Sequence, residues 1–218
     1  MGCGKSLLAR GKRVGEVASK SGVVTRIAGP TGGRGSCKSA GVECGRGFSR
    51  GMFVVKTSAG VSKTEAYREL NAQLAALLAG ERDGLANAAN FAALLWQGLP
   101  QLNWSGFYFL RGDELVLGPF QGKVACVRIK LGRGVCGTAA QRRETIVVPD
   151  VEAFPGHIAC DHASRSEIVV PLVHEGKLIG VLDLDSPELA RFDADDAAGL
   201  AESVRIFLQA SDLARLAE

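Results

Sequence analysis

The 218-residue sequence lacks several features that would assign it to a class at once. No apolar run approaches the roughly 20 residues that a membrane-spanning helix needs, so a transmembrane protein is excluded. A secretory hydrophobic region is also missing, so we expect a reducing, cytoplasmic location, where cysteines are more often reactive or metal-bound than structural. The composition, 46% hydrophobic and 22% charged, is typical of a globular protein of one domain.

Acidic residues are scarce in the first 60 positions, which hold eleven Lys and Arg, two Glu and 14 of the 28 glycines. The rest of the chain carries 15 basic and 21 acidic residues. The net charge of +3 therefore averages two different segments and gives no reason to expect a nucleic-acid partner. Residues 1–51 show no sustained apolar period, so we predict a disordered, basic, Gly/Ser-rich extension before a domain that spans 61–218.

Three interpretations of this extension stay open. Its first six residues, Met1 to Ser6, fit the pattern for N-terminal acylation, with a cysteine placed for a second acyl chain. An Arg- and Ser-rich segment with few acids is also typical of an organelle presequence. The interpretation we favour is that translation begins at Met52, where the composition becomes ordinary, and that residues 1–51 are not translated.

The hydrophobic periodicity after residue 60 predicts an α+β domain. Ser62 and Glu65 form a capping box at the start of a first helix. Further helices are predicted at about 85–99, 134–142 and 194–213, and strands at 104–110, 115–118, 125–129, 145–148, 167–173 and 177–185. This order gives a central, mostly antiparallel sheet with the terminal helices packed on one face. The connection 149–166 is long and irregular, which is typical of functional loops.

The three cysteines of the domain, Cys126, Cys136 and Cys160, are 10 and 24 residues apart, unlike the close pairs of structural zinc sites. No metal is therefore expected, although His157 and His162 flank Cys160 and keep a zinc site open as an alternative. A cysteine can also be a small buried hydrophobe, which suits Cys136 best. Cys160 lies in the long loop, where histidines could stabilise its thiolate and a second thiol could pair with it.

Acidic residues give a second signal. Asp183 and Asp185 alternate on the last strand and so share one face of the sheet, and Glu167, on the preceding strand, could join them. They mark either a solvated strand end or a carboxylate pair that binds an ammonium group or supplies a proton. Trp104 and Tyr108 also share a face, as core packing or as an aromatic wall around a small ligand.

Together these positions resemble the free methionine-(R)-sulfoxide reductases, single-domain members of the GAF fold. The resemblance covers residues 61–218 and none of 1–51. Its motifs are Leu102-Asn103-Trp104-Ser105-Gly106-Phe107-Tyr108, Gly118-Pro119-Phe120-Gln121-Gly122, Gly132-x-Gly134-Val135-Cys136-Gly137, Phe154-Pro155-Gly156-His157-Ile158-x-Cys160-Asp161 and Gly180-Val181-Leu182-Asp183-Leu184-Asp185-Ser186. The last motif alone indicates only a GAF domain. The three cysteines with their loop are more specific, since sensory GAF modules lack them.

The resemblance implies a thiol-dependent oxidoreductase that reduces free methionine sulfoxide and acts in oxidative stress. Cys160 is then the catalytic cysteine, Cys126 resolves it by an intramolecular disulfide, and Cys136 is auxiliary. The implied substrate pocket consists of Trp104, Tyr108, Glu167, Asp183 and Asp185. No bound cofactor is implied, because a thioredoxin-type donor reduces the disulfide. A homodimer is expected by analogy, and a GAF sensor without turnover is the alternative function.

Overall fold

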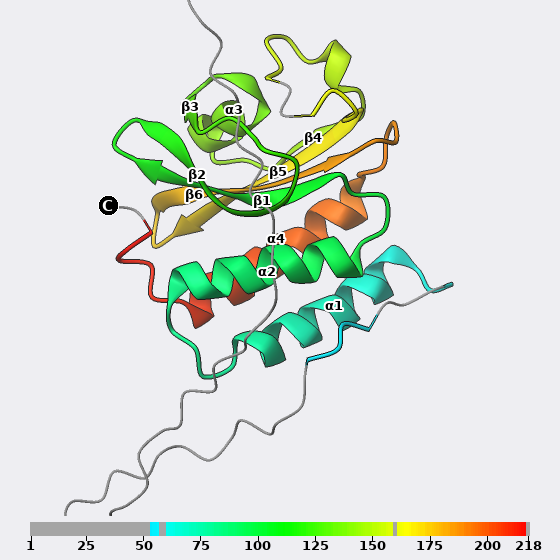
Figure 1. Ribbon diagram of the computed structural model, residues 1–218, viewed down its shortest axis with the longest axis vertical. Helices are drawn as coiled ribbons and strands as arrows, with labels where there is room; N and C mark the ends of the chain where they lie inside the picture. The colour runs from blue at the N-terminus through cyan, green and yellow to red at the C-terminus, as the bar shows by residue number, and fades with distance from the viewer. Residues whose placement is uncertain (1–52, 57–59, 159–160, 217–218) are drawn as a thin grey trace, which may run out of the picture. The chain divides into compact units, whose positions relative to one another are not determined.

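The computed structural model describes residues 53–56, 60–158 and 161–216, and these form a six-stranded sheet with four α-helices (Figure 1). In chain order the elements are α1 (Lys63–Leu78), α2 (Gly84–Gly98), β1 (Trp104–Arg111), β2 (Glu114–Gly122), β3 (Arg128–Lys130), α3 (Gly134–Arg142), β4 (Ile146–Val148), the 3₁₀ turn η1 (Val151–Ala153), β5 (Ser166–His174), β6 (Lys177–Ser186) and α4 (Ala194–Ala210). Within this part of the chain, none of the helices has both the length and the apolar character needed to cross a bilayer.

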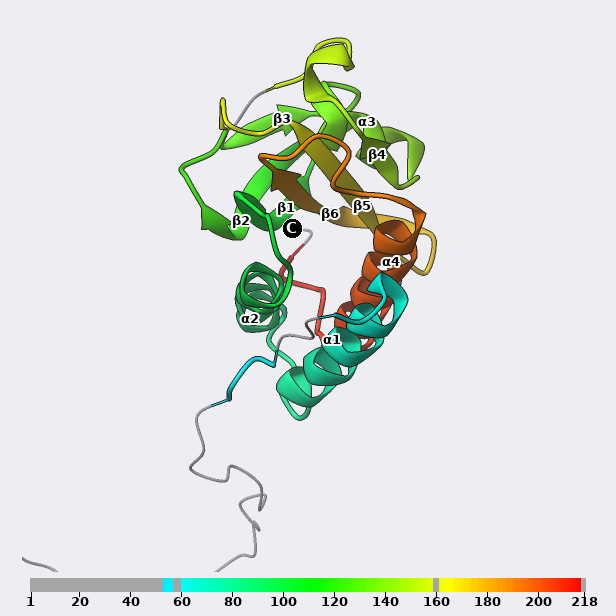
Figure 2. The same cartoon turned by 90° about the vertical axis from the view of Figure 1, so that its right-hand side faces the viewer.

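The sheet has the strand order β3-β2-β1-β6-β5-β4, and every neighbouring pair in it is antiparallel. Helices α1, α2 and α4 lie on one side of it, with α1 in an outer layer against α4 and α2, and α3 lies on the opposite side (Figure 2). Each side has its own apolar core, one around Phe107 and Phe207 and the other around Trp104, Tyr108 and Val181. The predicted α+β fold with terminal helices on one face is confirmed.

Side-chain caps mark the starts of α1, α2 and α4. The Ser62 hydroxyl accepts a hydrogen bond from the Glu65 amide at 3.2 Å, as predicted, but the Glu65 carboxylate pairs with Arg68 at 2.8 Å, so the box is half formed. The complete capping box belongs to α4, where Asp193 and Asp196 exchange bonds with each other's backbone. Asp196 is fully buried and also accepts from Tyr67 Oη at 3.0 Å, which ties α4 to α1.

One sequence prediction fails at the level of a single element. The predicted strand 125–129 is wrong over most of its length, since β3 covers only residues 128–130. The other strands lie within a few residues of their predicted positions, with β2 longer than expected at its C-terminal end.

Residues 123–127 are irregular because side chains from β1 bind their carbonyl groups. Trp104 Nε1 donates to the Lys123 carbonyl oxygen at 3.1 Å, and Tyr108 Oη donates to the Cys126 carbonyl oxygen at 3.0 Å. The Val127 carbonyl oxygen accepts from the Leu117 amide at 3.0 Å. These three hydrogen bonds hold the segment, which forms no strand ladder. The alternation of apolar and polar residues along the sequence does not predict them.

The predicted extension 1–51 lies outside the described residues, so its interpretations remain predictions. A chain that begins at Met52 is expected to melt at the same temperature as the full chain, because the extension is too polar to form a core and the Ser62 cap is retained. Thermal unfolding of both proteins by circular dichroism measures this, and limited proteolysis should remove residues before Ser62 and leave a stable core. A lower melting temperature or aggregation of the shorter chain would contradict the prediction.

Candidate active site

The predicted acidic residues meet on the α3 side of the sheet. Strand alternation places Asp183 and Asp185 of β6 on that face, and Glu167 of β5 pairs directly with Asp185 in the register of the sheet. On its other side Asp185 is paired with Trp104 of β1. The three acids are only 4–5% exposed, so the alternative of a solvated strand end is wrong. Buried acids on a sheet require partners or a function.

Gly106 allows the strands and aromatic rings around these acids to pack closely. It is paired with Asp183 across β1 and β6. A Cβ atom at Gly106 would lie 2.4 Å from Phe120 Cβ and 2.7 Å from Trp104 Cη2, closer than atoms can approach. The stacked pair of Trp104 and Phe120, with ring centroids 5.4 Å apart, therefore depends on a glycine here.

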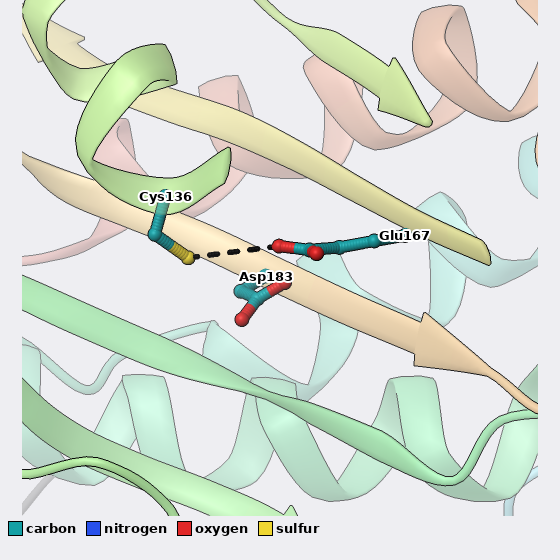
Figure 3. A group of neighbouring side chains, drawn as sticks. All are labelled: Cys136, Glu167 and Asp183. Atoms are coloured by element: carbon teal, nitrogen blue, oxygen red, sulfur yellow. Dashed lines mark hydrogen bonds between the residues drawn. The ribbon is translucent and has the colours of Figure 1, made fainter. Parts of the chain in front are cut away.

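Cys136, in the first turn of α3, completes the site from above the sheet. Its Sγ lies 4.0 Å from Glu167 Oε1, toward which the thiol donates, and Asp183 lies beside both (Figure 3). One ligand atom from each of the three residues lies within 4.8 Å of the other two, a spacing at which they could hold a metal ion. The group contains one thiol, whereas structural zinc sites are built from several thiolates and imidazoles.

Burial disfavours the charged forms of this group. Burial, with the charges of Asp183 and Glu167, raises the pKa of the Cys136 thiol well above its usual value. Burial also raises the pKa of Glu167, Asp183 and Asp185. The charge of an acidic neighbour raises the pKa of each of these carboxyl groups further. The site therefore holds carboxylic acids that can donate a proton, beside a thiol that is a poor nucleophile.

One oxygen of this group has no partner. Asp183 Oδ1 is buried and accepts no hydrogen bond in the described part of the chain. Asp183 lines a small cavity of about 10 Å³, which has room for about one water molecule. The cavity is lined by Ile129, Arg133, Gly134, Val135, Cys136, Ile158, Glu167, Asp183 and Asp185. A buried carboxyl oxygen without a partner is costly, so this arrangement is suited to a ligand that supplies a donor.

His157 makes a contact with the acids that the sequence did not predict. It was considered as a neighbour of Cys160 or a zinc ligand, but its Nε2 lies 3.3 Å from Glu167 Oε2. Burial lowers the pKa of His157, so this contact joins an imidazole and a carboxyl group that both favour their neutral forms. No periodicity predicts the contact, since His157 lies in an irregular stretch of backbone after η1.

The remaining predicted site residues lie around this group. Trp104 and Tyr108 are fully buried in the core beneath α3, and their stacked rings have centroids 5.9 Å apart. Neither residue is among those that line the cavity. Their place as a ligand wall stays a prediction, and the core-packing alternative describes their observed contacts. Cys126 is half-buried in segment 123–127. Cys160 lies outside the described residues, so its predicted role stays a prediction.

The chain matches one family model and is similar in sequence to several known proteins. The family model described as "GAF domain" matches residues 64–210. The free methionine-R-sulfoxide reductase of Escherichia coli is 56% identical over 144 residues, which are 66% of this chain and 87% of that protein. The protein of the same name from Saccharomyces cerevisiae is 42% identical over 160 residues, 70% of this chain and 89% of that one.

Two solved structures of proteins with the same activity in their names are also similar to this chain. The free methionine-R-sulfoxide reductase of Neisseria meningitidis, in complex with its substrate, is 48% identical. It superposes with a TM-score of 0.71 over 75% of this chain and 98% of that one. The reduced form of the corresponding protein of Staphylococcus aureus is 51% identical, with a TM-score of 0.65 over 66% of this chain and 94% of that one.

Proposed function

This chain belongs to the GAF domain family and, within it, to the free methionine-R-sulfoxide reductases, and we propose that it reduces free L-methionine (R)-sulfoxide by a thiol mechanism. The observation that carries the proposal is the buried group of Cys136, Glu167 and Asp183, with its unpartnered carboxyl oxygen. Protonated acids in a closed site can donate to an oxygen that leaves a sulfur atom. Membership of this family makes the chain an oxidoreductase.

We propose that the acids also select the free amino acid. Glu167, Asp183 and Asp185 offer six carboxyl oxygens on one face of the sheet, and an ammonium group would supply the donor that Asp183 Oδ1 lacks. A peptide bond removes that ammonium group, so peptide-bound methionine sulfoxide would leave these oxygens unpaired. The cavity of about 10 Å³ is too small for an amino acid, so its lining has to open for the substrate to enter.

The proposed chemistry begins at Cys160. Its thiolate attacks the sulfoxide sulfur, and a protonated acid of the site gives its proton to the sulfoxide oxygen. The S–O bond of the substrate then breaks as the hydroxyl passes to the Cys160 sulfur, which releases methionine and leaves a sulfenic acid on Cys160. The Cys126 thiol then attacks the Cys160 sulfur, so that an S–S bond forms, the S–O bond breaks and water leaves. Cys136 is buried with a raised pKa, which supports an auxiliary role beside the acids rather than nucleophilic attack.

A thioredoxin-type protein is the proposed electron donor, in a reducing compartment such as the cytoplasm. The surface around Cys126 supports a protein partner, because Val124 and Val127 on either side of it are 87% and 63% exposed. Two valines exposed beside a redox-active thiol are suited to burial against the partner that attacks the disulfide.

Replacing both valines with serine is expected to raise the KM for thioredoxin about tenfold, since each loses the burial of one apolar side chain. Turnover driven by dithiothreitol, which needs no docking surface, should be unchanged. Steady-state assays with both reductants measure this split, and Val54→Ser, which changes another exposed valine, is the control. Equal losses with both reductants would mean that the valines serve the fold and not the partner.

The experiment that tests the proposed function is an assay of methionine release from free methionine (R)-sulfoxide, with thioredoxin, thioredoxin reductase and NADPH. Release is expected from that substrate, and neither from the free (S)-sulfoxide nor from the N-acetylated (R)-sulfoxide. Binding without release would favour the alternative of a GAF sensor. Metal analysis of the purified protein separates a thiol enzyme from a zinc site at Cys136, Glu167 and Asp183.

The predicted homodimer also stays a proposal. A groove of about 1040 Å³ runs between α1 and α4 on the side away from the sheet, and small residues such as Ala72, Ala75 and Ala198 line it. It is far larger than the cavity at the acids, but it contains no cysteine and none of the predicted site residues. Sedimentation analysis of the protein over a range of concentrations tests the dimer.

A further inference from the structure

A second polar cluster lies beside the site, and the proposed chemistry does not use it. Asp161 Oδ1 accepts from Lys123 Nζ at 3.0 Å and from the Ala163 amide at 2.9 Å, and Oδ2 accepts from Asn103 Nδ2 at 3.4 Å. Asn103 Nδ2 also donates to Ser164 Oγ at 3.0 Å. We call Asn103, Lys123 and Asp161 the clasp. It joins the start of β1, the segment after β2 and the loop before β5.

The Asp161 carboxylate differs from the acids of the cavity in its charge. Its side chain is 6% exposed, yet the Ala163 amide and the Lys123 ammonium hold its pKa below the usual value, so it is ionised at neutral pH. An ionised carboxylate with so little exposure needs partners for all its lone pairs. Lys123 is its cationic partner and is itself 70% exposed, so salt can screen this pair.

The clasp connects the two segments that carry the proposed thiol couple. Lys123 precedes Cys126 by three residues, and Trp104 and Tyr108 fix that segment to β1 through its carbonyl groups. Asp161 directly follows Cys160 in the sequence, so the two residues share a peptide bond. A restraint on Asp161 therefore limits where residue 160 can reach relative to Cys126.

We propose that Lys123, Asp161 and Asn103 are positioning residues for disulfide formation, and the proposal rests on the thiol mechanism proposed above. A disulfide requires Cα atoms about 4.4–6.8 Å apart and a narrow range of Cβ directions. The clasp raises the effective concentration of the Cys126 thiol at the Cys160 sulfenic acid. It acts on the step in which the S–S bond forms and water leaves, and not on the attack that releases methionine.

A single-turnover experiment separates these two steps. The pre-reduced full-length protein is mixed with free methionine (R)-sulfoxide without reductant, and methionine, sulfenic acid and disulfide are quantified over time by rapid quench and mass spectrometry. Lys123→Met and Asp161→Asn remove the ion pair, Lys123→Arg keeps it, and Lys177→Met, at an exposed lysine of the β5–β6 hairpin, is the control. Lys123→Met also guards against misfolding, because this side chain is mostly exposed.

In Lys123→Met and Asp161→Asn, methionine release should stay within about twofold of the unmodified protein, while disulfide formation slows about tenfold and sulfenic acid accumulates. Lys123→Arg and Lys177→Met should behave like the unmodified protein. Raising the salt concentration to about 1 M should slow disulfide formation in the unmodified protein and leave Lys123→Met unchanged.

Equal slowing of both steps would overturn the proposal, since the clasp would then shape the substrate site. Unchanged disulfide formation in both clasp variants would overturn it as well. If the unmodified protein releases methionine but forms no Cys126–Cys160 disulfide, the resolving mechanism itself is wrong. That failure differs from failure of the clasp, because it appears without any substitution.

Discussion

Cys160→Ser is expected to abolish methionine sulfoxide reduction with every reductant. A hydroxyl at this position cannot supply the thiolate that attacks the sulfoxide sulfur, and the described cysteines offer no substitute. Cys136 is buried and its pKa is raised, and the Cys126 backbone is anchored to β1 by Tyr108. The measurement is methionine release with thioredoxin and with dithiothreitol, at enzyme concentrations high enough to detect a single turnover.

Cys126→Ser is the matched variant for the second step. It should release about one methionine per site and then stop with thioredoxin, because attack on the sulfoxide precedes resolution. Cys136→Ser should retain a full first turnover, since a protonated thiol beside Glu167 is not the proposed nucleophile. Substantial turnover by Cys160→Ser would show that the nucleophile is misassigned, whatever the behaviour of the other two variants.

Much of the candidate site can be read from the sequence because its geometry follows from local periodicity. The alternation of Asp183 and Asp185 fixes a common face, and the short hairpin between β5 and β6 brings Glu167 opposite Asp185. The first turn of α3 was predicted at Gly134, which places Cys136 within that turn. Hairpins and helix starts are set by neighbouring residues, so one sequence is enough to predict them.

The contacts that the sequence did not predict join residues whose proximity depends on irregular backbone. His157, in the irregular backbone after η1, meets Glu167 of β5, and Lys123 meets Asp161 across 38 positions. The strand predicted at 125–129 failed for the same reason, since side chains from β1 compete for its carbonyl groups. Neither the period of a strand nor that of a helix carries information about such partners.

Asp183→Asn is expected to lower kcat/KM by about ten- to a hundredfold, because a charge-assisted contact contributes about 1.5–3 kcal/mol to binding or to the transition state. Glu167→Gln should have an effect of the same size, since its carboxyl group lies between Cys136 and His157. Steady-state kinetics with free methionine (R)-sulfoxide measure both variants. Asp113→Asn, in the exposed turn between β1 and β2, is the matched control.

The same substitution should act on stability in the opposite direction. Burial raises the pKa of Asp183 in the folded state above its unfolded value near 3.8, so the folded protein binds a proton more tightly than the unfolded chain does. The unmodified protein therefore loses stability as the pH rises above that unfolded value toward the folded pKa, whereas an amide at this position has no proton to lose. The melting temperature of Asp183→Asn minus that of the unmodified protein should increase between about pH 4 and pH 8.

If Asp183 serves function and not stability, Asp183→Asn should lower activity while it raises the stability of the folded protein relative to the unmodified protein. An unpartnered buried oxygen destabilises the folded protein, and the proposed ammonium group of the substrate would satisfy it. A further consequence is that free methionine should raise the melting temperature of the unmodified protein more than that of Asp183→Asn. Normal kinetics in Asp183→Asn and Glu167→Gln, together with a melting difference that does not depend on pH, would mean that these acids neither bind nor protonate the substrate.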